Sequence, residues 1–357
     1  MYPKLVVNLK KLQFNVRFLT DKLKEHGLSI MAITKVHSAD KEIVNLFDTF
    51  PEIEYFGDSR IENLMTYQGS QKKKILIRVP MHSEIKETVQ YADMSFNSER
   101  STIKRLNEEA KKQNKIHDVL LMVDLGDLRE GFFQEDELMD TVADIMQMDH
   151  IKIMGLGTNL TCYGAVLPDE KNLGQLLAYQ AKIEEKFDVK LEMISGGNSS
   201  SLYLLDDSEL TLPKGITNLR IGEAFFSGGE TAHGRQYPTM HDDVFTLQAE
   251  IVELKEKPSF PIGNRGVDAF GQMPTFEDKG NRMRGILAVG RQDVAFDGLR
   301  PIDAGISIVG ASSDHLIVDF TDSQNAYQVG DVVEFNMDYG AMLAAFTSKY
   351  IKKEYVK

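Results

Sequence analysis

The chain has 357 residues, of which 42% are hydrophobic and 27% are charged, a composition typical of a globular protein long enough to form two domains. Its formal net charge of −13 argues against polyanionic partners, so we expect binding neither to nucleic acid nor to an anionic membrane surface. The single cysteine, Cys162, excludes an intrachain disulfide and favours a cytoplasmic location. No run of about 18 consecutive apolar residues is present, so no membrane span is expected.

From residue 28 onward, short apolar runs alternate with segments whose apolar residues recur at helical spacing. Near-continuous apolar runs are typical of parallel strands that are buried on both faces. We expect strands at residues 28–35, 54–59, 74–80, 92–98, 118–126, 151–160, 190–198 and 218–226. Eight strands with intervening helices predict a (β/α)₈ barrel over residues 11–230, with an open doubly wound sheet as the alternative. The expected N-caps of three of the helices are Ser38, Ser98 and Asp169.

The pattern changes after about residue 230. The remaining segments resemble strands separated by turns, with no helix of comparable strength between them. They predict a C-terminal all-β domain over residues 231–357. A strand within residues 1–10 is a candidate to join that domain, although it precedes the barrel in the chain.

Function in a (β/α)₈ barrel lies where strands end and helices begin, so polar residues at the strand ends are the candidates. Lys35 ends the first predicted strand, and the segment SGGNSSS, residues 195–201, follows the seventh. Glycines and exposed N–H groups at a helix start can bind a phosphate, although a flexible loop with a helix cap has the same sequence. Taken by itself, Lys35 could instead be a structural lysine whose aliphatic stem packs at the barrel rim.

Together, the lysine and the phosphate-binding segment point to one cofactor. A lysine amine that faces a phosphate site across a barrel mouth is what pyridoxal 5′-phosphate requires, because the amine forms an imine with the cofactor aldehyde. We therefore predict a pyridoxal-phosphate site in which Lys35 holds the cofactor.

Several segments of the chain resemble the alanine racemase superfamily, the fold-type III pyridoxal-phosphate enzymes. The segments are AITKVHSADKEI, FGDSRIENL, GLGTNL, SGGNSSSL, RIGEAFFSGGET, GRQDV and GASSDHLIVD. They are most similar to the amino-acid racemase branch that contains ornithine racemase, and the likeness spans nearly the whole chain. The resemblance implies an isomerase that interconverts L- and D-amino acids, ornithine above all, with Lys35 as one of two bases acting at Cα.

The resemblance also implies roles for other residues. Arg220 matches the arginine that faces the pyridine nitrogen and keeps it unprotonated, which suits reversible proton exchange; a structural ion pair is the alternative. Arg129 resembles the arginine that supports the substrate carboxylate or the ring hydroxyl, and Asn159 replaces a histidine that packs near the ring. The implied phosphate contacts are Ser199, the backbone amides of Gly222 and Glu223, and Tyr339. For Tyr339, a tyrosine of the core is the alternative.

Two tyrosines of the family pattern are missing. The second base of alanine racemases is a tyrosine, but Arg291 stands there in GRQDV, and a guanidinium group is a poor base. Ala39 replaces the other tyrosine, and His37 is expected to take over part of its phosphate contact. Asp314 falls at the segment that contacts the substrate carboxylate, so the resemblance puts Arg291 and Asp314 beside the substrate.

The identity of the second base therefore stays open. His315 is the first choice because imidazole titrates near neutrality, although a structural histidine is at least as good an interpretation. The candidates by chemistry are His315, Asp293, Tyr163 and Cys162. A cationic substrate side chain needs a carboxylate partner, for which the candidates are Glu223, Asp124 and Asp127.

Two other functions share this fold. A D-amino-acid lyase or aldolase is disfavoured because several such enzymes hold a metal with His and Cys of the β-domain, whereas Cys162 lies in the barrel; we expect no metal site. A non-catalytic pyridoxal-phosphate carrier would consist of the barrel alone. The resemblance implies a homodimer with active sites shared across its interface and a small amino acid as substrate, alanine or another amino acid being the alternative to ornithine.

Overall fold

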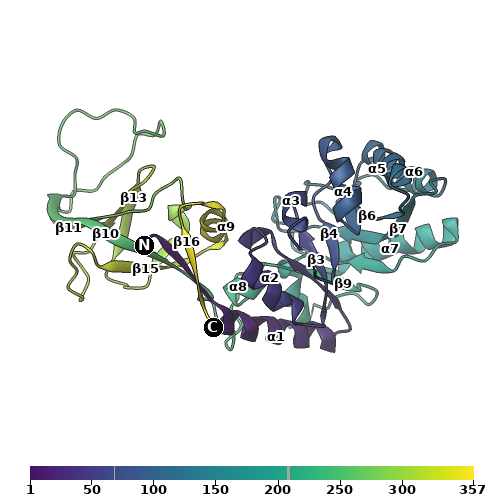
Figure 1. The fold of residues 1–357 in the computed structure, drawn as a ribbon, viewed down its shortest axis with the longest axis horizontal. Coiled ribbons are helices and arrows are strands. Elements are labelled where there is room, and N and C mark those ends of the chain that lie inside the picture. Colours follow the sequence, from purple (N-terminus) through teal and green to yellow (C-terminus); the bar gives the residue numbers. More distant parts are fainter. Residues whose placement is uncertain (68, 207–209) are drawn as a thin grey trace. The chain divides into compact units, whose positions relative to one another are not determined.

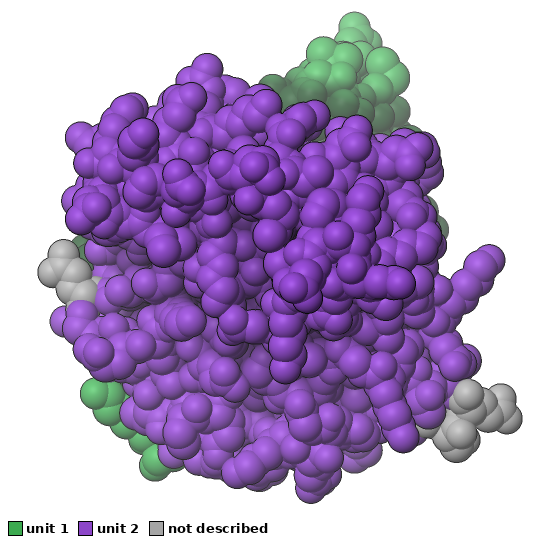
Figure 2. Space-filling view, turned by 90° about the vertical axis from the view of Figure 1, so that its right-hand side faces the viewer, with its two compact units in different colours: residues 1–10, 243–357 green, residues 11–242 purple. Residues whose placement is uncertain are grey.

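The computed structural model (Figure 1) describes residues 1–67, 69–206 and 210–357. Contacts divide the chain into two compact units, one of residues 11–242 and the other of residues 1–10 together with 243–357, and Figure 2 colours them separately. Residues 231–242 thus lie with the first unit rather than with the second. Within the described part of the chain, no helix combines the length and the apolar character needed to cross a membrane.

Residues 11–242 form a closed barrel of eight parallel strands, which confirms the predicted (β/α)₈ fold and rules out the open sheet (Figure 1). The strands follow one another in chain order, and β9 closes the barrel by pairing with β2, where Ala32 lies opposite Ile221. Parallel pairing brings the carboxyl ends of all the strands to one end of the barrel. The strands are β2 (Ser29–Ile33), β3 (Ile53–Asp58), β4 (Lys73–Leu76), β5 (Met94–Asn97), β6 (His117–Val123), β7 (Ile151–Thr158), β8 (Met193–Ser195) and β9 (Asn218–Ile221).

Helices connect the barrel strands, and a buried cluster rich in methionine fills the space between them. Methionine is unbranched and flexible, so it fills irregular core space. The cluster consists of Met31, Ile33, Ile75, Met94, Phe96, Leu120, Met122, Met154 and Met193. The α-helices are α1 (Leu9–Glu25), α2 (Lys41–Asp48), α3 (Ile61–Leu64), α4 (Ile85–Tyr91), α5 (Arg100–Lys112), α6 (Glu135–Ile145), α7 (Glu170–Phe187) and α8 (Ala224–Ser227). The 3₁₀ helices are η1 (Lys35–His37), η2 (His82–Glu84) and η3 (Ser199–Leu205).

The second unit is a mostly antiparallel sheet to which the N-terminal strand β1 (Lys4–Asn8) contributes by pairing with β10 and β16. The helix α9 (Tyr339–Thr347) interrupts the predicted all-strand pattern. Asp338 stabilises its start by accepting a hydrogen bond from Ala341 N at 2.8 Å. The sequence analysis missed this helix, since the residues Asp-Tyr-Gly also fit a turn. The remaining elements are β10 (Phe245–Pro258), β11 (Asn281–Leu287), η4 (Phe296–Gly298), β12 (Leu299–Pro301), β13 (Ser307–Ala311), β14 (Leu316–Asp319), β15 (Val332–Met337) and β16 (Lys352–Val356).

Two of the three predicted helix caps are wrong. Asp169 caps α7 through a reciprocal pair of hydrogen bonds, as predicted. Asp40, rather than Ser38, caps α2, because Ser38 takes a left-handed conformation with φ of 49° at the end of η1. Glu99, rather than Ser98, is the residue that precedes α5. In both cases the chain makes an additional turn between strand and helix that the residue types did not reveal.

Gly155 in β7 and Gly174 in α7 offer a matched test of how closely the barrel strands approach. A Cβ at Gly155 would lie 1.6 Å from Met193 O in the paired strand β8, so Gly155→Ala must separate two strands, and we expect it to lower the free energy of unfolding by about 3 kcal/mol. Gly174→Ala adds a Cβ with no heavy atom within 4 Å and should raise that free energy by about 0.5 kcal/mol. Urea denaturation measures both, and equal changes would contradict this account.

Candidate active site

Lys35 lies at the carboxyl end of the barrel but not in a strand. β2 ends at Ile33, and Lys35 begins the 3₁₀ helix η1 after Thr34. The sequence analysis extended this strand too far, because the apolar run LSIMAIT gives no signal for the turn. The lysine is therefore carried by a short turn where the strands end.

The turn that carries Lys35 is tight. Ser38 and Ala39 follow η1 with φ of 49° and 57°, a left-handed conformation that costs each L-residue about 1 kcal/mol. Ser38 N closes the turn by donating a hydrogen bond to Lys35 O at 3.1 Å. His37 is fully buried, and its Nδ1 accepts a hydrogen bond from Asp40 N at 3.1 Å. Contacts on both sides of the turn thus hold a strained backbone in place.

Arg220 on β9 is 4% exposed, and its guanidinium donates hydrogen bonds to neutral groups. Nη1 donates to Ser195 Oγ at 2.8 Å, and Nη2 donates to Thr158 O at 2.7 Å and to Asn159 Oδ1 at 3.2 Å. Burial lowers the pKa of Arg220 to about 10, which leaves the group charged near neutrality. Among the residues that the structure describes, no carboxylate lies within ion-pair distance of Arg220, so the ion-pair alternative finds no support.

The segment 195–201 lies against the start of α8. Ser199 begins η3, and its buried hydroxyl accepts hydrogen bonds from Gly222 N at 3.4 Å and Ala224 N at 3.3 Å. Both distances are long for an N–H···O hydrogen bond. The expected phosphate contacts Ser199 and Gly222 are therefore neighbours, and Glu223 follows Gly222 directly before α8.

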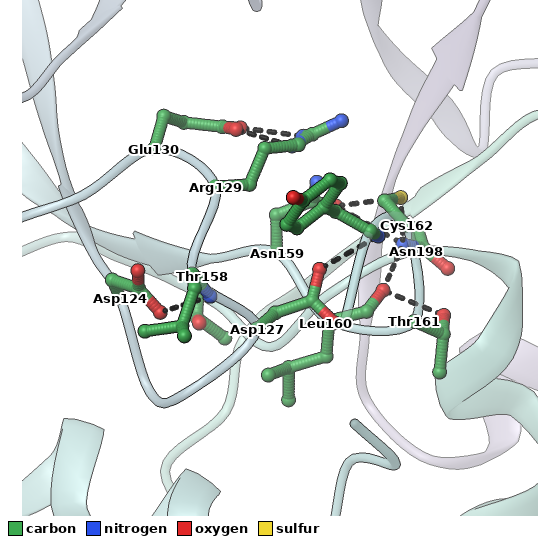
Figure 3. Close-up of polar contacts among 12 residues, drawn as sticks. Asp124, Asp127, Arg129, Glu130, Thr158, Asn159, Leu160, Thr161, Cys162 and Asn198 are labelled. Carbon is green, nitrogen blue, oxygen red and sulfur yellow. Dashed lines mark hydrogen bonds and ion pairs between the residues drawn. The ribbon is translucent and has the colours of Figure 1, made fainter. Parts of the chain in front are cut away.

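Asn198 connects segment 195–201 to the loop that follows β7 (Figure 3). Its Oδ1 accepts a hydrogen bond from Ser200 N at 2.8 Å and so caps η3, while its Nδ2 donates to Asn159 Oδ1 at 3.0 Å. The same nitrogen lies 3.4 Å from Cys162 Sγ. Because Asn159 also accepts a hydrogen bond from Arg220, one network joins Arg220 to segment 195–201. The sequence analysis did not single out Asn198, although an asparagine before a serine run is typical of a helix cap.

Arg129, on the loop after β6, forms an ion pair with the next residue, Glu130 (Figure 3). Burial lowers the pKa of Arg220, and the charge of Glu130 acts in the opposite direction. The sequence analysis overlooked Glu130. Its position directly after Arg129, a predicted site residue, was the signal that could have identified it. Arg129 therefore has a fixed anionic neighbour at the strand ends.

Two carboxylates that were candidate partners for a cationic substrate accept hydrogen bonds from the loops at the strand ends. Asp127 is fully buried, and its oxygens accept hydrogen bonds from Tyr163 N at 2.9 Å and Val166 N at 3.1 Å. Asp124 Oδ1 accepts two N–H groups of its own loop. The expectation for Asp127 is wrong, because both of its oxygens are occupied within the protein and the side chain is inaccessible to a ligand.

Three of the expected residues of the second unit form one group. Arg291 N donates a hydrogen bond to Ser312 O at 2.9 Å, which brings Arg291 alongside the turn that carries Asp314 and His315. His315 Nδ1 lies 3.0 Å from Asp314 Oδ1, and the two side chains are 48% and 59% exposed. The imidazole and the carboxylate of this pair are therefore both open to solvent.

Asp293 and Tyr339 have different surroundings in that unit. Asp293 is buried and accepts a hydrogen bond from Ser348 Oγ at 2.7 Å, which ties its loop to the residue after α9. Tyr339 is the first residue of α9 and is partly buried. Of the two residues predicted as catalytic in this unit, His315 has the exposed side chain and Asp293 has the buried one.

Comparison with known proteins identifies a family and close relatives. The family profile “Alanine racemase, N-terminal domain” matches residues 7–228. The sequence is 49% identical over 354 residues, 99% of both chains, to the ornithine racemase of Acetoanaerobium sticklandii. It is 36% identical over 357 residues, again 99% of both chains, to the lysine racemase of Thermotoga maritima. The fold resembles that of an alanine racemase from Bartonella henselae with covalently bound pyridoxal phosphate, with a TM-score of 0.73 and 18% identity over 100% of both chains.

Asp127 offers a test of how firmly the loops at the strand ends are held. Asp127→Ala leaves two backbone N–H groups without their acceptor, so we expect the free energy of unfolding to fall by about 2 kcal/mol. Hydrogen exchange of residues 161–166 should become faster. Asp136→Ala, at an exposed position of α6, is the control and should change the free energy by less than about 0.5 kcal/mol. Unchanged exchange in the Asp127 variant would show that other contacts hold the loop.

Proposed function

Since this chain belongs to the alanine racemase family and is an amino-acid racemase, we propose that its cofactor is pyridoxal 5′-phosphate and its substrate is ornithine. The observation that carries the proposal is the placement of Lys35, Ser199 and Arg220 at the carboxyl ends of one closed barrel, in a chain similar over its whole length to an ornithine racemase. Racemisation of alanine or of another amino acid is the alternative that the experiments below decide.

The residues at the strand ends fit this cofactor. Thr158 Oγ1, Asn159 Nδ2 and Ser200 Oγ are buried and have no hydrogen-bond partner among the described residues. Buried polar atoms are nearly always paired, so three unpaired ones beside Arg220 and Ser199 favour a polar ligand there. The aldehyde of the cofactor requires a lysine, and its phosphate requires hydroxyl and N–H groups at a helix start. Its pyridine nitrogen requires a donor such as a guanidinium.

The chain's own residues then have distinct tasks. Pyridoxal phosphate, when bound, supplies an electron sink that makes the α-proton of an amino acid removable. Lys35 Nζ holds the cofactor and moves the α-proton on one face of Cα. Arg220 donates to the ring nitrogen and, because it is charged, keeps that nitrogen unprotonated, which limits side reactions. The other proposed contacts are Ser199, His37, Tyr339 and the backbone amides of Gly222 and Glu223 at the phosphate, Arg129 and Asn159 at the ring, and Arg291 with the segment of Asp314 at the substrate carboxylate.

We propose His315 as the base on the opposite face of Cα. Its half-exposed imidazole lies next to the Asp314 carboxylate, which can accept a hydrogen bond from the ring and orient it. Asp293 is the less suitable candidate, since its carboxylate is buried and accepts a hydrogen bond from Ser348. We also propose a homodimer in which the second unit of one subunit completes the site of the other, as the family resemblance implies.

The proposed substrate follows from the names of two relatives and from the charges near the site. The relatives are named for ornithine and for lysine, amino acids whose side chains both end in an ammonium group. The one named for ornithine is the more similar of the two, at 49% against 36% identity. Because Asp127 is buried with both oxygens occupied, Asp124 and Glu223 are the candidate partners for that ammonium group.

Incubation of the cofactor-loaded enzyme with single L-amino acids in deuterated water tests the proposal. We expect loss of optical rotation together with exchange of the Cα proton for deuterium, fastest with ornithine, slower with lysine and slowest with alanine. Lys35→Ala should reduce both rates by about 10³-fold or more, because the cofactor link and one base are lost together. Preference for alanine would contradict the substrate, cleavage products would indicate a lyase, and absence of exchange would indicate a carrier.

His315→Asn tests the two-base assignment. Lys35 alone can still remove and return a proton on its own face, so one enantiomer of ornithine should exchange its Cα proton without inversion. The other enantiomer should not exchange, and racemisation should fall by roughly 10²-fold or more. Proton NMR of each enantiomer in deuterated water measures the exchange. Exchange from both enantiomers, or from neither, would contradict the role of His315.

The same variants test whether the sites are shared between subunits. Subunits carrying Lys35→Ala and His315→Asn are mixed, dissociated and allowed to reassociate. A site built from two subunits is intact once in each mixed dimer, so about a quarter of the wild-type racemase activity should return. If each site lies within one subunit, the mixture stays inactive.

A further inference from the structure

Tyr67, Thr34 and Asp58 form a buried chain of hydrogen bonds directly before Lys35. Tyr67 Oη donates to Thr34 Oγ1 at 2.5 Å, and Thr34 Oγ1 donates to Asp58 Oδ2 at 2.7 Å. The three side chains come from the segment after α3, the end of β2 and the end of β3, and none is more than 4% exposed. The racemase chemistry described above uses none of them.

Asp58 gives this chain a fixed direction. Its second oxygen accepts hydrogen bonds from Arg60 N at 2.9 Å and Asn63 Nδ2 at 3.1 Å, so both oxygens have donors. Burial raises the pKa of Asp58, and the hydrogen bonds that it accepts, from Thr34 first, oppose that rise. Because a carboxylate can only accept, the Thr34 hydroxyl points its proton at Asp58 Oδ2, the nearer of its two acceptors at 2.7 Å against 3.2 Å for Gly57 O, and its lone pair at the Tyr67 hydroxyl.

Thr34 is the residue by which the turn is attached to the barrel. Its N–H donates to Gly57 O in β3 at 3.0 Å, and its carbonyl accepts from Ala39 N at 3.2 Å. Ala39 is one of the two left-handed residues of the turn, so Thr34 holds the strained segment at its start. Strained backbone persists only where surrounding contacts fix it, and a lysine that transfers a proton needs a fixed origin for its flexible side chain.

We infer that Asp58 and Tyr67, acting through Thr34, are positioning residues that hold the turn of Lys35 in its reactive geometry. The inference rests on the proposed function, in which Lys35 is the catalytic lysine. It gives the segment FGDSRIENL, which supplies Asp58, a task in the reaction. Neither Asp58 nor Tyr67 touches the reacting atoms in this account.

Thr34→Val and Thr34→Ser form the central test. Valine has nearly the shape of threonine but removes the hydroxyl, which leaves Asp58 without one donor and Tyr67 without its acceptor, whereas serine keeps the hydroxyl. In the holoenzyme we expect Thr34→Val to lower kcat about tenfold with KM within about twofold of wild type, because Lys35 transfers a proton and does not bind the substrate side chain. Thr34→Ser should restore kcat to within about twofold.

Two further variants separate positioning from general loss of stability. Tyr67→Phe removes only the outer hydrogen bond and should lower kcat about threefold. Thr88→Val removes a buried threonine hydroxyl that donates to Glu84 O at 2.8 Å, away from the turn of Lys35 in the sequence, and should leave kcat unchanged. A kcat that falls equally in Thr88→Val and Thr34→Val would overturn the inference.

Hydrogen exchange of the cofactor-free protein gives a readout that does not depend on activity. The N–H groups of Ser38, Ala39 and Asp40 donate to backbone carbonyls within the turn. Thr34→Val should raise their exchange about tenfold, and Thr34→Ser should not. If Thr34→Val shows unchanged exchange and full kcat, the inference is overturned. The proposed function still stands in that case, provided that Lys35→Ala is inactive. If the wild-type enzyme racemises no amino acid, the proposed function fails, and the exchange experiment still decides whether the chain of hydrogen bonds holds the turn.

Discussion

The buried guanidinium of Arg220 is the constraint around which the carboxyl ends of the barrel strands are arranged. Its donors reach Ser195, Thr158 and Asn159, so one side chain joins the ends of β7, β8 and β9. Neutral acceptors and the ring of Phe96, whose centroid lies 5.5 Å from the guanidinium carbon, compensate for burial of the charge. If the loop after β7 moved, the Arg220 guanidinium would lose its acceptor Asn159. The hydrogen bonds that hold this loop therefore also keep the buried charge paired.

Closure of the barrel brings Lys35 to the same place. β2 pairs with β9, and Met31 lies opposite Arg220, so the turn after β2 follows the strand that adjoins Arg220. Buried polar contacts help to fix both groups, since Thr34 before Lys35 is bonded to Asp58, and Arg220 is bonded to Ser195. Apolar contacts are non-directional, whereas hydrogen bonds fix the orientation of one atom relative to another. Proton transfer depends on that orientation.

Several features of the candidate site could be predicted from the sequence and several could not. The eight strands, the lysine after the first and the SGGNSSS segment after the seventh are local patterns, and the structure shows the predicted closed barrel. The helix α9, the caps at Asp40 and Glu99, and the use of Asp127 by a loop were missed. Asp127 shows the physical reason, because a carboxylate after a strand has the same sequence signature whether it faces a ligand or the N–H groups of a neighbouring loop.

The sequence by itself determined which kind of fold and chemistry are possible, because strand and helix periodicity, a lysine after a strand and a serine-rich helix start are properties of short segments. Only the tertiary structure decided which polar groups are partners. Tyr67 and Asp58 meet through Thr34, and Asn198 meets Asn159, across long intervals of sequence that carry no signal for these contacts. A hydrogen bond depends on position to within a few tenths of an ångström, and that position is set by the closure of the barrel.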